Sequence, residues 1–414
     1  MTRSDTDFTA RATALDAADP LAAYPGEFVG HDDPEIVAYL DGNSLGRPTR
    51  RTAERLSAFV TEAWGRRLIR GWDEEWFELP LTLGDRIGGT LLGTAPGQTT
   101  VGDSTSVLLY KLARGALAMR PGRTEIVLDR DNFPTDRYLM ESIAAESDMT
   151  LRWIDADVDG GVTAADLAAV VSERTALVVL SHVAYRSGYL LDAPALTAVT
   201  HAAGAMLLLD LCHSAGAVEI ELDTWGVDFA AGCTYKYLNG GPGSPAFAYV
   251  RADHLADFRQ PIWGWMGREN PFDMAQGYVP APGIRRVISA SPGIVGMLPI
   301  QDMLDLIEAA GMPRVRAKSV ALTEFALELV REWLLPRGVT VSSPIDPARR
   351  GGHVTIDHPR FREITARLWQ RGVMPDFRRP HGIRLGLSPL STTFGEVLAG
   401  VTAIRDELDA DPDV

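Results

Sequence analysis

Residues 205–243 read AMLLLDLCHSAGAVEIELDTWGVDFAAGCTYKYLNGGPG, and their pattern sets the architecture of the chain. The apolar run 205–210 is typical of a buried strand, and it ends in Asp210. Lys236 then lies between two tyrosines, directly before a glycine-rich turn. Taken singly, Asp210 has an ordinary explanation as a helix cap and Lys236 as a solvated loop residue. Their order within one stretch favours a functional pair.

An aspartate and a lysine in this order suit the chemistry of pyridoxal phosphate. The lysine amine forms a Schiff base with the aldehyde of that cofactor. The carboxylate keeps the pyridine nitrogen protonated, so that the ring accepts electrons from the substrate. The sequence therefore predicts that Lys236 carries the cofactor and that Asp210 lies at its ring nitrogen.

Apolar runs alternate with amphipathic segments on the N-terminal side of this stretch. The predicted strands are 124–129, 151–154, 176–180 and 205–210, and the predicted helices are 134–145, 164–171 and 193–203. Such alternation is typical of an α/β fold with a mostly parallel, doubly wound sheet. Ligands bind these sheets at the carboxyl ends of the strands. Asp210, Asn132-Phe133 and Asp103-Ser104 follow strand ends, so we expect them to converge.

After about residue 292 the pattern changes to long amphipathic helices and short strands. We predict helices at 300–310, 314–335, 360–370 and 393–408, and strands at 339–341, 353–356 and 383–387. The expected division is an N-terminal arm (1–45) that contributes to the small domain and the active site, a large cofactor-binding domain (46–298) and a smaller α+β C-terminal domain (299–414).

The composition favours an enzyme that acts on a small molecule. The chain has 55 acidic and 40 basic residues, a formal net charge of −15, which argues against nucleic acid or an anionic membrane as a partner. No apolar run is long enough to span a bilayer, and no basic and apolar leader opens the chain. We therefore expect a cytoplasmic protein.

Cys212 and Cys233 flank the proposed cofactor residues and are the two cysteines of the chain. They are too few for a disulfide framework or a four-cysteine zinc site, and we predict no metal. A cysteine desulfurase would use one of them as a persulfide nucleophile. The favoured interpretation is that both are small buried residues, because a persulfide carrier is expected on a mobile loop.

Four motifs of the chain resemble the kynureninase family. They are YLDGNSLG at 39–46, NFPTD at 132–136, DLCHSAGA at 210–217 and GCTYKYLNGGPG at 232–243. The resemblance runs in order from about Leu15 to the region of Arg384. It implies a fold-type I pyridoxal-phosphate enzyme that is a homodimer with shared active sites. The implied reaction is hydrolysis of the Cβ–Cγ bond of L-kynurenine, or of a substituted kynurenine, to an anthranilate and L-alanine.

The resemblance also implies which residues hold the cofactor. At the phosphate these are Thr105, Ser106, Trp265, Tyr278 and Ser291, with Trp265 and Tyr278 contributing partly across the dimer interface. Around the ring they are Phe133, Asp136, Ser187, Asp210, His213, Tyr235 and Lys236. Phe133 would stack on the pyridine ring, and His213 would support Asp210. A helix that begins near Thr105 suits a phosphate dianion, because helix N-termini bind anions.

The catalytic residues that the resemblance implies are Lys236, Tyr235, Asp210 and Ser44. Lys236 would act as the general base at the substrate's α carbon, and Tyr235 matches a tyrosine associated with proton transfer. The substrate is an amino acid, for which Ser44, Trp72 and Arg384 match binding positions. A guanidinium such as that of Arg384 binds a carboxylate through two parallel hydrogen bonds.

Four positions depart from the family pattern. Arg268 replaces a common histidine, Leu108 and Ala184 replace asparagines, and Ala290-Ser291 replaces a Gly-Thr or Ser-Asn pair. These changes leave the substrate open. One alternative is a kynureninase-like enzyme of a specialised pathway that acts on a modified or non-aromatic β-acyl amino acid. Others are a different fold-type I reaction, such as a desulfurase or lyase, and a non-catalytic relative. The intact Lys236, Asp210 and Arg384 argue against the non-catalytic relative.

Overall fold

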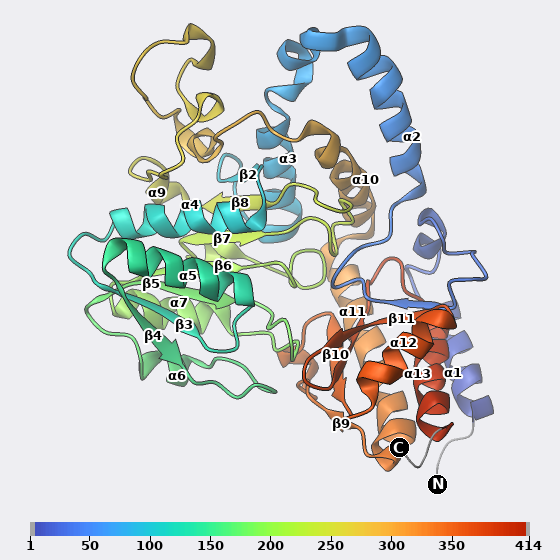
Figure 1. Ribbon diagram of the computed structural model, residues 1–414. Coiled ribbons are helices and arrows are strands. Elements are labelled where there is room, and N and C mark those ends of the chain that lie inside the picture. The colour runs from blue at the N-terminus through green and yellow to red at the C-terminus, as the bar shows by residue number, and fades with distance from the viewer. Residues whose placement is uncertain (1–4, 411–414) are drawn as a thin grey trace.

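The computed structural model describes residues 5–410, which form two β-sheets (Figure 1). The larger sheet has seven strands in the order β2-β8-β7-β6-β5-β3-β4. The strands are β2 (Thr99–Val101), β3 (Glu125–Asp129), β4 (Thr150–Ile154), β5 (Thr175–Ser181), β6 (Met206–Asp210), β7 (Phe229–Gly232) and β8 (Phe247–Val250). β8 is antiparallel to both of its neighbours, and the other pairs are parallel. The predicted mostly parallel α/β sheet is confirmed.

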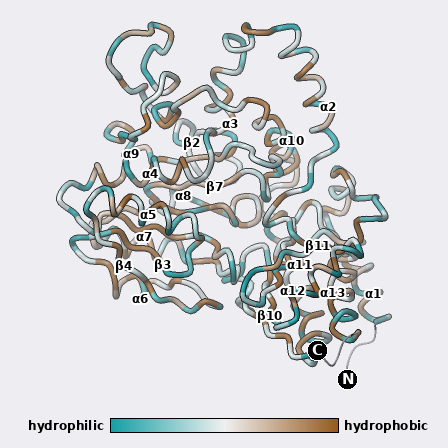
Figure 2. The backbone as a smooth tube through the Cα atoms, viewed as in Figure 1, coloured by the Kyte–Doolittle hydropathy of each residue, from teal (hydrophilic) through white to brown (hydrophobic). Residues whose placement is uncertain are grey.

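Helices cover both faces of this sheet because its central strands are apolar on both sides. In β6, Met206 and Leu208 belong to a core that includes residues of α4 (Thr105–Ala118) and α5 (Pro134–Ser147). Leu207 and Leu209 belong to the opposite core. That core includes residues of α3 (Leu79–Ile87), α6 (Ala164–Ala168), α7 (Ala193–Ala202) and α10 (Ile294–Ala310). Figure 2 shows hydrophobic residues concentrated along the strands and the adjoining helices.

The second sheet has five strands in the order β1-β11-β12-β10-β9. They are β1 (Ala38–Leu40), β9 (Thr340–Val341), β10 (His353–Asp357), β11 (Val373–Arg378) and β12 (Gly382–Gly386). The helices around it are α1 (Asp5–Ala18), α11 (Met312–Leu329), α12 (Phe361–Gln370) and α13 (Phe394–Asp409). Phe8 of α1 and Leu40 of β1 lie in the same hydrophobic core as Phe325, Val354 and Leu385. The N-terminal segment therefore packs with the C-terminal part of the chain. The division at residues 45 and 298 stays a prediction.

Two proline-containing elements differ from the sequence prediction. α10 begins at Ile294, six residues before the predicted start, and has Pro299 in its interior. β11 was not predicted, because Pro375 interrupts a short run of apolar residues. Its two halves use different partners: residues Val373–Pro375 pair with β1, and Asp376–Arg378 pair with β12. The proline lies at the point where one pairing gives way to the other.

Short helices complete the connections: α2 (Arg50–Ala58), α8 (Leu222–Trp225) and α9 (Ala252–Leu255). No helix within residues 5–410 is both long and apolar enough to cross a membrane. β2, β3, β6 and β7 run in the same direction, so the segments after Val101, Asp129, Asp210 and Gly232 emerge at one edge of the sheet. Predicted cofactor residues lie in or next to these segments: Thr105, Phe133, Asp210 and Lys236.

A buried acidic centre lies apart from this edge, at the start of β7. Asp228 is hydrogen-bonded to Nε2 of His201 (2.8 Å) and of His254 (2.7 Å), and it accepts from the backbone N–H of Leu207 (2.8 Å). Burial raises the pKa of Asp228, but the hydrogen bonds with His201 and His254 outweigh it and hold the pKa well below its usual value. The ionised carboxylate therefore stabilises the fold.

Asp228→Asn should lower the free energy of unfolding at pH 7 by about 3 kcal/mol, the usual cost of breaking a buried charged pair. Because the folded-state pKa is depressed, the stabilisation is complete above the unfolded pKa of about 4 and is lost as the pH falls below it. Urea denaturation at pH 7, 4 and 3 measures the free energy of unfolding of wild type and variant. The difference between the two should become smaller as the pH falls. A gap that is constant over this range would contradict the assignment.

Candidate active site

Lys236 lies in the loop that follows β7, and its side chain is buried. Its Nζ atom is 3.2 Å from Nε2 of His213. The ring centres of Phe133 and Tyr235 each lie 5.9 Å from the same atom. The loop therefore brings the buried amine beside an imidazole and two aromatic rings at the carboxyl ends of the strands.

The three lysines of the sequence are all buried, but they differ in their partners. Lys111 forms an ion pair with Asp103, and Lys318 forms one with Asp19. Among the ion pairs of residues 5–410, none joins a carboxylate to Lys236. An amine without an ion-pair partner is free to react, which is what a covalent cofactor anchor requires.

His213 lies between the lysine and the guanidinium of Arg384. Its Nε2 is 3.2 Å from Nζ of Lys236 and 3.4 Å from Nη1 of Arg384. Burial, followed by the positive charges of Lys236 and Arg384, holds the pKa of His213 well below its usual value. The neutral ring is therefore an acceptor for these two cations. The predicted support of Asp210 by His213 stays a prediction.

Asp210 ends β6, opposite Ser181 in β5 and Ala231 in β7. Its carboxylate is buried and accepts a hydrogen bond of 2.7 Å from the backbone N–H of Cys212. The turn after the strand thus fixes the carboxylate at the carboxyl end of β6. Ligands of doubly wound α/β sheets bind at the carboxyl ends of the strands.

Asp136 places a second carboxyl group beside the first. It lies in the first turn of α5 and is 1% exposed. Burial, and next the negative charge of Asp210, raises its pKa well above the usual value, while Lys236 acts in the opposite direction. Its Oδ2 has no hydrogen-bond partner within residues 5–410. An unpartnered oxygen here fits a site that receives a further polar group.

Phe133 forms an aromatic wall next to this group. It is the N-cap residue of α5, and Asn132 Oδ1 accepts a hydrogen bond of 2.7 Å from its backbone N–H. Its ring meets that of Tyr185 edge to face, with centroids 5.4 Å apart. A ring whose backbone is anchored and whose side chain packs on Tyr185 is suited to pack against a planar ligand.

Three of the five predicted phosphate residues, Thr105, Ser106 and Ser291, lie around the N-terminus of α4. Thr105 and Ser106 begin this helix, and Ser104 caps it by accepting from the backbone N–H of Val107. A hollow of about 320 Å³ adjoins the cap and is lined by Ser104, Gly243 and Ser291, among others. Free N–H groups at a helix start attract a phosphate. The hollow brings Ser291 close to the α4 cap, and the phosphate contacts of Thr105, Ser106 and Ser291 stay predictions.

Trp265 and Tyr278 lie on a different segment, within 259–293. The hydroxyl of Tyr278 donates to the carbonyl oxygen of Gly267 (3.0 Å), and its ring stacks on Trp263 with centroids 4.9 Å apart. Trp265 is 38% exposed and contacts Phe272 edge to face. Their predicted phosphate contacts stay a prediction.

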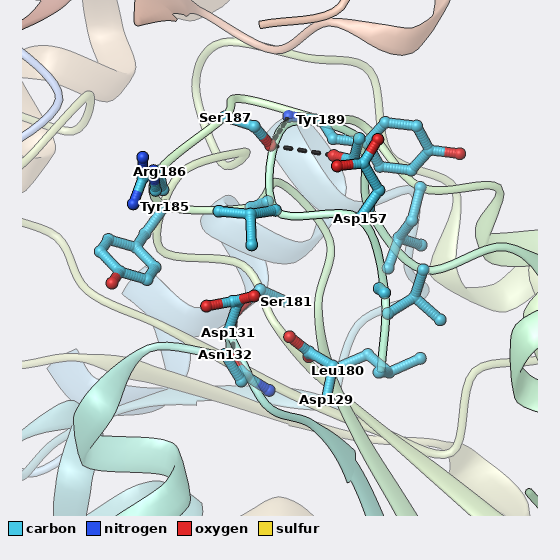
Figure 3. Close-up of a pocket in the computed structure, with 17 residues that line it drawn as sticks. Asp129, Asp131, Asn132, Asp157, Leu180, Ser181, Tyr185, Arg186, Ser187 and Tyr189 are labelled. Atoms are coloured by element: carbon cyan, nitrogen blue, oxygen red, sulfur yellow. Dashed lines mark hydrogen bonds between the residues drawn. The ribbon is translucent and has the colours of Figure 1, made fainter. Parts of the chain in front are cut away.

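Ser187 lines a small neighbouring pocket of about 40 Å³ (Figure 3). Its hydroxyl donates to the carbonyl oxygen of Gly160 (3.0 Å) and accepts from the backbone N–H of Tyr189 (3.2 Å). Asp129, Asn132 and Tyr185 also line this pocket. The structure thus uses Ser187 to hold the loop around residue 160, and its predicted place at the cofactor ring stays a prediction.

Arg384 and Ser44 come together, although 340 residues separate them in sequence. Nη2 of Arg384 donates to Oγ of Ser44 (2.9 Å), and Nη1 donates to the carbonyl oxygen of Tyr185 (2.7 Å). Trp72, the third predicted substrate residue, is half-buried and packs edge to face on Trp76 at 5.7 Å. The structure therefore joins two of the three substrate residues to His213 and Lys236.

Two carboxylates that sequence reasoning missed lie beside Arg384. Asp376 Oδ2 accepts from Nε of Arg384 (2.6 Å). Burial, and then the charge of Asp376, raises the pKa of Asp41 to about 6. Asp41 belongs to the 39–46 motif, and this motif could have identified it as a site residue. Asp376 lies on β11, the strand that the sequence pattern did not predict.

The N-terminal loop is fitted closely to the lysine loop. The backbone N–H of Gly46 donates to the carbonyl oxygen of Tyr235 (2.8 Å), and Nδ2 of Asn239 donates to the carbonyl oxygen of Arg47 (2.6 Å). A Cβ atom on Gly46 would lie 2.3 Å from the carbonyl oxygen of Lys236. Tyr235 itself is buried enough to raise its pKa, which the neighbouring Cys233 raises further.

Gly46→Ala should therefore weaken cofactor binding, because the added methyl group must push the Lys236 loop away. We expect the dissociation constant for pyridoxal phosphate to rise at least about tenfold, which corresponds to the 1–3 kcal/mol cost of overpacking. Absorbance titration of the cofactor into the apoprotein measures it. Gly26→Ala is the control, since a Cβ atom there has no atom within 4 Å. Equal affinity in both variants would contradict the close fit.

Cys212 and Cys233 are both buried, and neither forms a disulfide bond. The backbone N–H of Cys233 lies 3.2 Å from Sγ of Cys212. The hydrogen bond with Cys233 and burial raise the pKa of the Cys212 thiol. The interpretation of both cysteines as small buried residues is confirmed.

The donor set fits pyridoxal phosphate. An unpaired buried amine (Lys236), an ionisable carboxylate at a strand end (Asp210), an aromatic wall (Phe133) and a helix start with an adjoining hollow lie at one edge of the sheet. The unpartnered Oδ2 of Asp136 leaves room for a polar group of the ligand. Each part of the cofactor thus has a matching group in the protein.

Comparisons with known proteins agree with this geometry. Residues 315–404 match the family model of the kynureninase C-terminal domain. The chain is 40% identical over 407 residues to kynureninase of Burkholderia pseudomallei (strain 1106a), covering 97% of this chain and 95% of the relative. It is 40% identical over 403 residues to kynureninase of Pseudomonas fluorescens, covering 96% and 94%.

Solved structures share the fold at lower identity. The apo cysteine desulfurase of Thermococcus onnurineus NA1 has a TM-score of 0.80 at 18% identity, covering 94% of this chain and 98% of that one. A C-DES mutant with glycine covalently linked to its PLP cofactor has a TM-score of 0.81 at 19% identity, covering 92% and 98%. These likenesses establish the fold. The near full-length identity to the curated relatives establishes the family: the chain belongs to the kynureninase family.

Proposed function

We propose that the protein is a pyridoxal-phosphate-dependent hydrolase that cleaves the Cβ–Cγ bond of L-kynurenine to anthranilate and L-alanine. One observation carries the proposal: Nε2 of His213 lies within 3.4 Å of both Nζ of Lys236 and Nη1 of Arg384, so an amine and a guanidinium that can bind a carboxylate meet at one ring. Kynureninases that are 40% identical over almost the whole chain support the reaction.

The residues divide the work of this reaction among them. When bound, pyridoxal phosphate supplies an electron sink for the bond changes at the substrate's α carbon. Lys236 anchors it and then holds or moves the proton of that carbon, and its neighbour His213, whose pKa is held well below its usual value, carries no negative charge that would hold the amine in an ion pair. Asp210 would face the ring nitrogen, and Phe133 would hold the ring plane.

Arg384 and Ser44 orient the substrate. Arg384 binds the α-carboxylate, because a buried guanidinium gives two parallel hydrogen bonds. Ser44, which touches Arg384, then has its hydroxyl near the substrate's γ-carbonyl. A donor at that place stabilises the oxyanion that forms when water adds to the carbonyl group.

The departures from the family pattern bear on substrate preference to different degrees. Leu108 is buried in the core between α4 and the sheet, so it shapes the core rather than the pocket. Arg268 donates to the carbonyl oxygens of Glu269 and Asn270 and holds its own loop. Ala290 lines the hollow at the α4 cap, and Ala184 lines the pocket around Ser187. None of these contacts favours a non-aromatic substrate.

The test is incubation of the holoenzyme with L-kynurenine, 3-hydroxykynurenine and other ring-substituted kynurenines, with release of alanine and of the aromatic acid measured together. We expect equal amounts of both products from at least one of them. No alanine from any kynurenine would overturn the proposal. Alanine from a non-aromatic β-acyl amino acid alone would shift it to the specialised-pathway alternative.

A homodimer with shared active sites is part of the proposal. Large apolar side chains are exposed on two protruding segments: Trp64 (54%), Ile69 (78%), Trp263 (64%) and Met274 (72%). Exposed apolar patches of this kind mark association surfaces. The same segments carry Trp72 and Trp265, so a second copy that covers them would complete the site. A cytoplasmic location stays a prediction.

Ile69→Asp should disrupt this dimer, because it places a charge in an apolar interface. Light scattering coupled to size exclusion should give about twice 44.9 kDa for wild type and about 44.9 kDa for the variant. We expect the monomer to lose activity together with the shared residues. Val158→Asp, on a different exposed loop, is the control and should stay dimeric. A monomeric wild type with full activity would contradict shared sites.

A further inference from the structure

The guanidinium of Arg384 has all of its N–H donors engaged by protein atoms. Nε and Nη2 lie 2.6 Å and 2.5 Å from Oδ2 of Asp376. Nη2 also donates to Oγ of Ser44 (2.9 Å). Nη1 donates to the carbonyl oxygen of Tyr185 (2.7 Å) and lies 3.4 Å from Nε2 of His213. Because arginine has five N–H donors, an incoming carboxylate must replace some of these contacts.

These contacts divide between two edges of the guanidinium. The edge formed by Nε and Nη2 faces the carboxylate of Asp376. The edge formed by Nη1 and Nη2 faces the neutral groups of Ser44, Tyr185 and His213. Either edge has the geometry to bind a carboxylate through two hydrogen bonds. Hydrogen bonds to neutral groups are weaker than those to a charged one, so the second edge is the one that exchanges.

The position of Asp376 is set by the sheet. Asp376 of β11 lies directly opposite Arg384 of β12 in the antiparallel register. Opposite charges in such a cross-strand pair stabilise each other. Arg378, two residues further along β11, lies 2.9 Å from the same carboxylate. Both the backbone pairing and a second guanidinium thus hold Asp376 in place, whereas Ser44 and His213 lie on loops.

We propose that Asp376 is a positioning residue for substrate recognition: it fixes one edge of Arg384, so that the other edge receives the α-carboxylate in place of Ser44 and His213. This inference rests on the proposed function, since it concerns how an amino-acid substrate is held. The exchange releases the Ser44 hydroxyl from the guanidinium when the carboxylate binds.

A second account of Asp376 makes the opposite prediction. If Asp376 merely occupied the place of the substrate carboxylate, its removal would open that place and lower KM. If it fixes the guanidinium, its removal lets Arg384 turn toward other acceptors and raises KM. The sign of the change in KM therefore separates positioning from competition.

The experiment compares Asp376→Asn and Asp376→Ala with wild type as holoenzymes. Asparagine keeps the size and one acceptor oxygen, and alanine removes both. We expect KM for L-kynurenine to rise about tenfold in Asp376→Asn and about 100-fold in Asp376→Ala, with kcat within about threefold, as for a residue that acts on binding. If the alanine variant does not fold, the asparagine variant carries the test.

A binding measurement makes the result independent of turnover. L-Alanine, the amino-acid product, carries the same carboxylate and changes the absorbance of the bound cofactor when it binds. Its dissociation constant should rise by the same factors as KM. If wild type hydrolyses no kynurenine, the proposed function fails, but alanine binding still tests the positioning by Asp376.

Asp357→Asn is the matched control, because it removes a carboxylate from the same sheet without touching Arg384. Asp357 lies on β10, 3.7 Å from Arg186 and hydrogen-bonded to Ser342. KM and alanine binding should stay within about twofold in this variant. Unchanged or lower values of both in the Asp376 variants would overturn the proposal. An equal rise in Asp357→Asn, or a fall in kcat alone, would also overturn it.

Discussion

Lys236→Ala should reduce kynurenine hydrolysis by at least about 10⁴-fold while leaving the protein folded. The variant removes both the cofactor anchor and the base at the α carbon, and a positioned base alone contributes up to about 10⁴-fold. The fold should tolerate the change because Lys236 forms no ion pair within residues 5–410, so its removal breaks no direct salt bridge to a buried carboxylate. Single-turnover assays and circular dichroism would measure the two effects.

The three lysines provide an internal control for this prediction. Borohydride reduction of the cofactor-loaded wild type, followed by peptide mapping, should label the peptide with Lys236 and leave those with Lys111 and Lys318 unlabelled. Lys111 and Lys318 are held by Asp103 and Asp19, so their amines are not free to react. Label on either of these peptides, or substantial turnover by Lys236→Ala, would disprove the assignment.

Asp210→Asn should lower kcat by about 10² to 10⁴-fold, the effect of losing the 3–5 kcal/mol of a buried charged contact. Asparagine has nearly the same shape and still accepts the hydrogen bond from the N–H of Cys212, so the loop after β6 is retained. What is lost is the negative charge that we propose lies at the ring nitrogen of the cofactor. Steady-state rates at saturating cofactor would measure the change.

The matched control for Asp210 is Asp129→Asn, which changes another aspartate at a strand end. Burial raises the pKa of Asp129 to about 7, and it lines the pocket around Ser187. Its replacement should alter kcat by less than about threefold. If kcat of Asp210→Asn decreased no more than kcat of this control, the charge of Asp210 would have no part in the reaction.

The sequence predicts β3, β4, β5 and β6 of the larger sheet because each of these strands carries its own apolar signal, whereas β7 and β8 were not predicted. The run from Met206 to Asp210 is apolar on both faces, as a central parallel strand must be, and its final carboxylate marks the site edge. Lys236 and Asp210 could be paired from their order alone. The structure then brings them to Asp136 and Phe133, as parallel strands with a common edge require.

The small sheet shows where such reasoning stops. Pro375 hides β11 from a pattern-based prediction, since proline is rare inside strands. Asp376 therefore had no predicted element, and its pairing with Arg384 depends on an antiparallel register between two strands. In the same way, the hydroxyl of Ser187 donates its hydrogen bond to the carbonyl oxygen of Gly160. This contact joins two loops and cannot be predicted from a local sequence pattern. The local pattern of apolar residues is enough to predict a strand. Which polar side chains remain free to bind a ligand depends on contacts between segments that are distant in the sequence.

The burial of all three lysines also shapes the outside of the molecule. No lysine amine is left on the surface, so the exposed permanent cations of residues 5–410 are arginines. Arginine keeps its proton at any pH at which a protein stays folded. The positive charge of the surface should thus be constant in mildly alkaline solution. Reagents that modify lysine amines would have to enter the active site to find one that is not held in an ion pair.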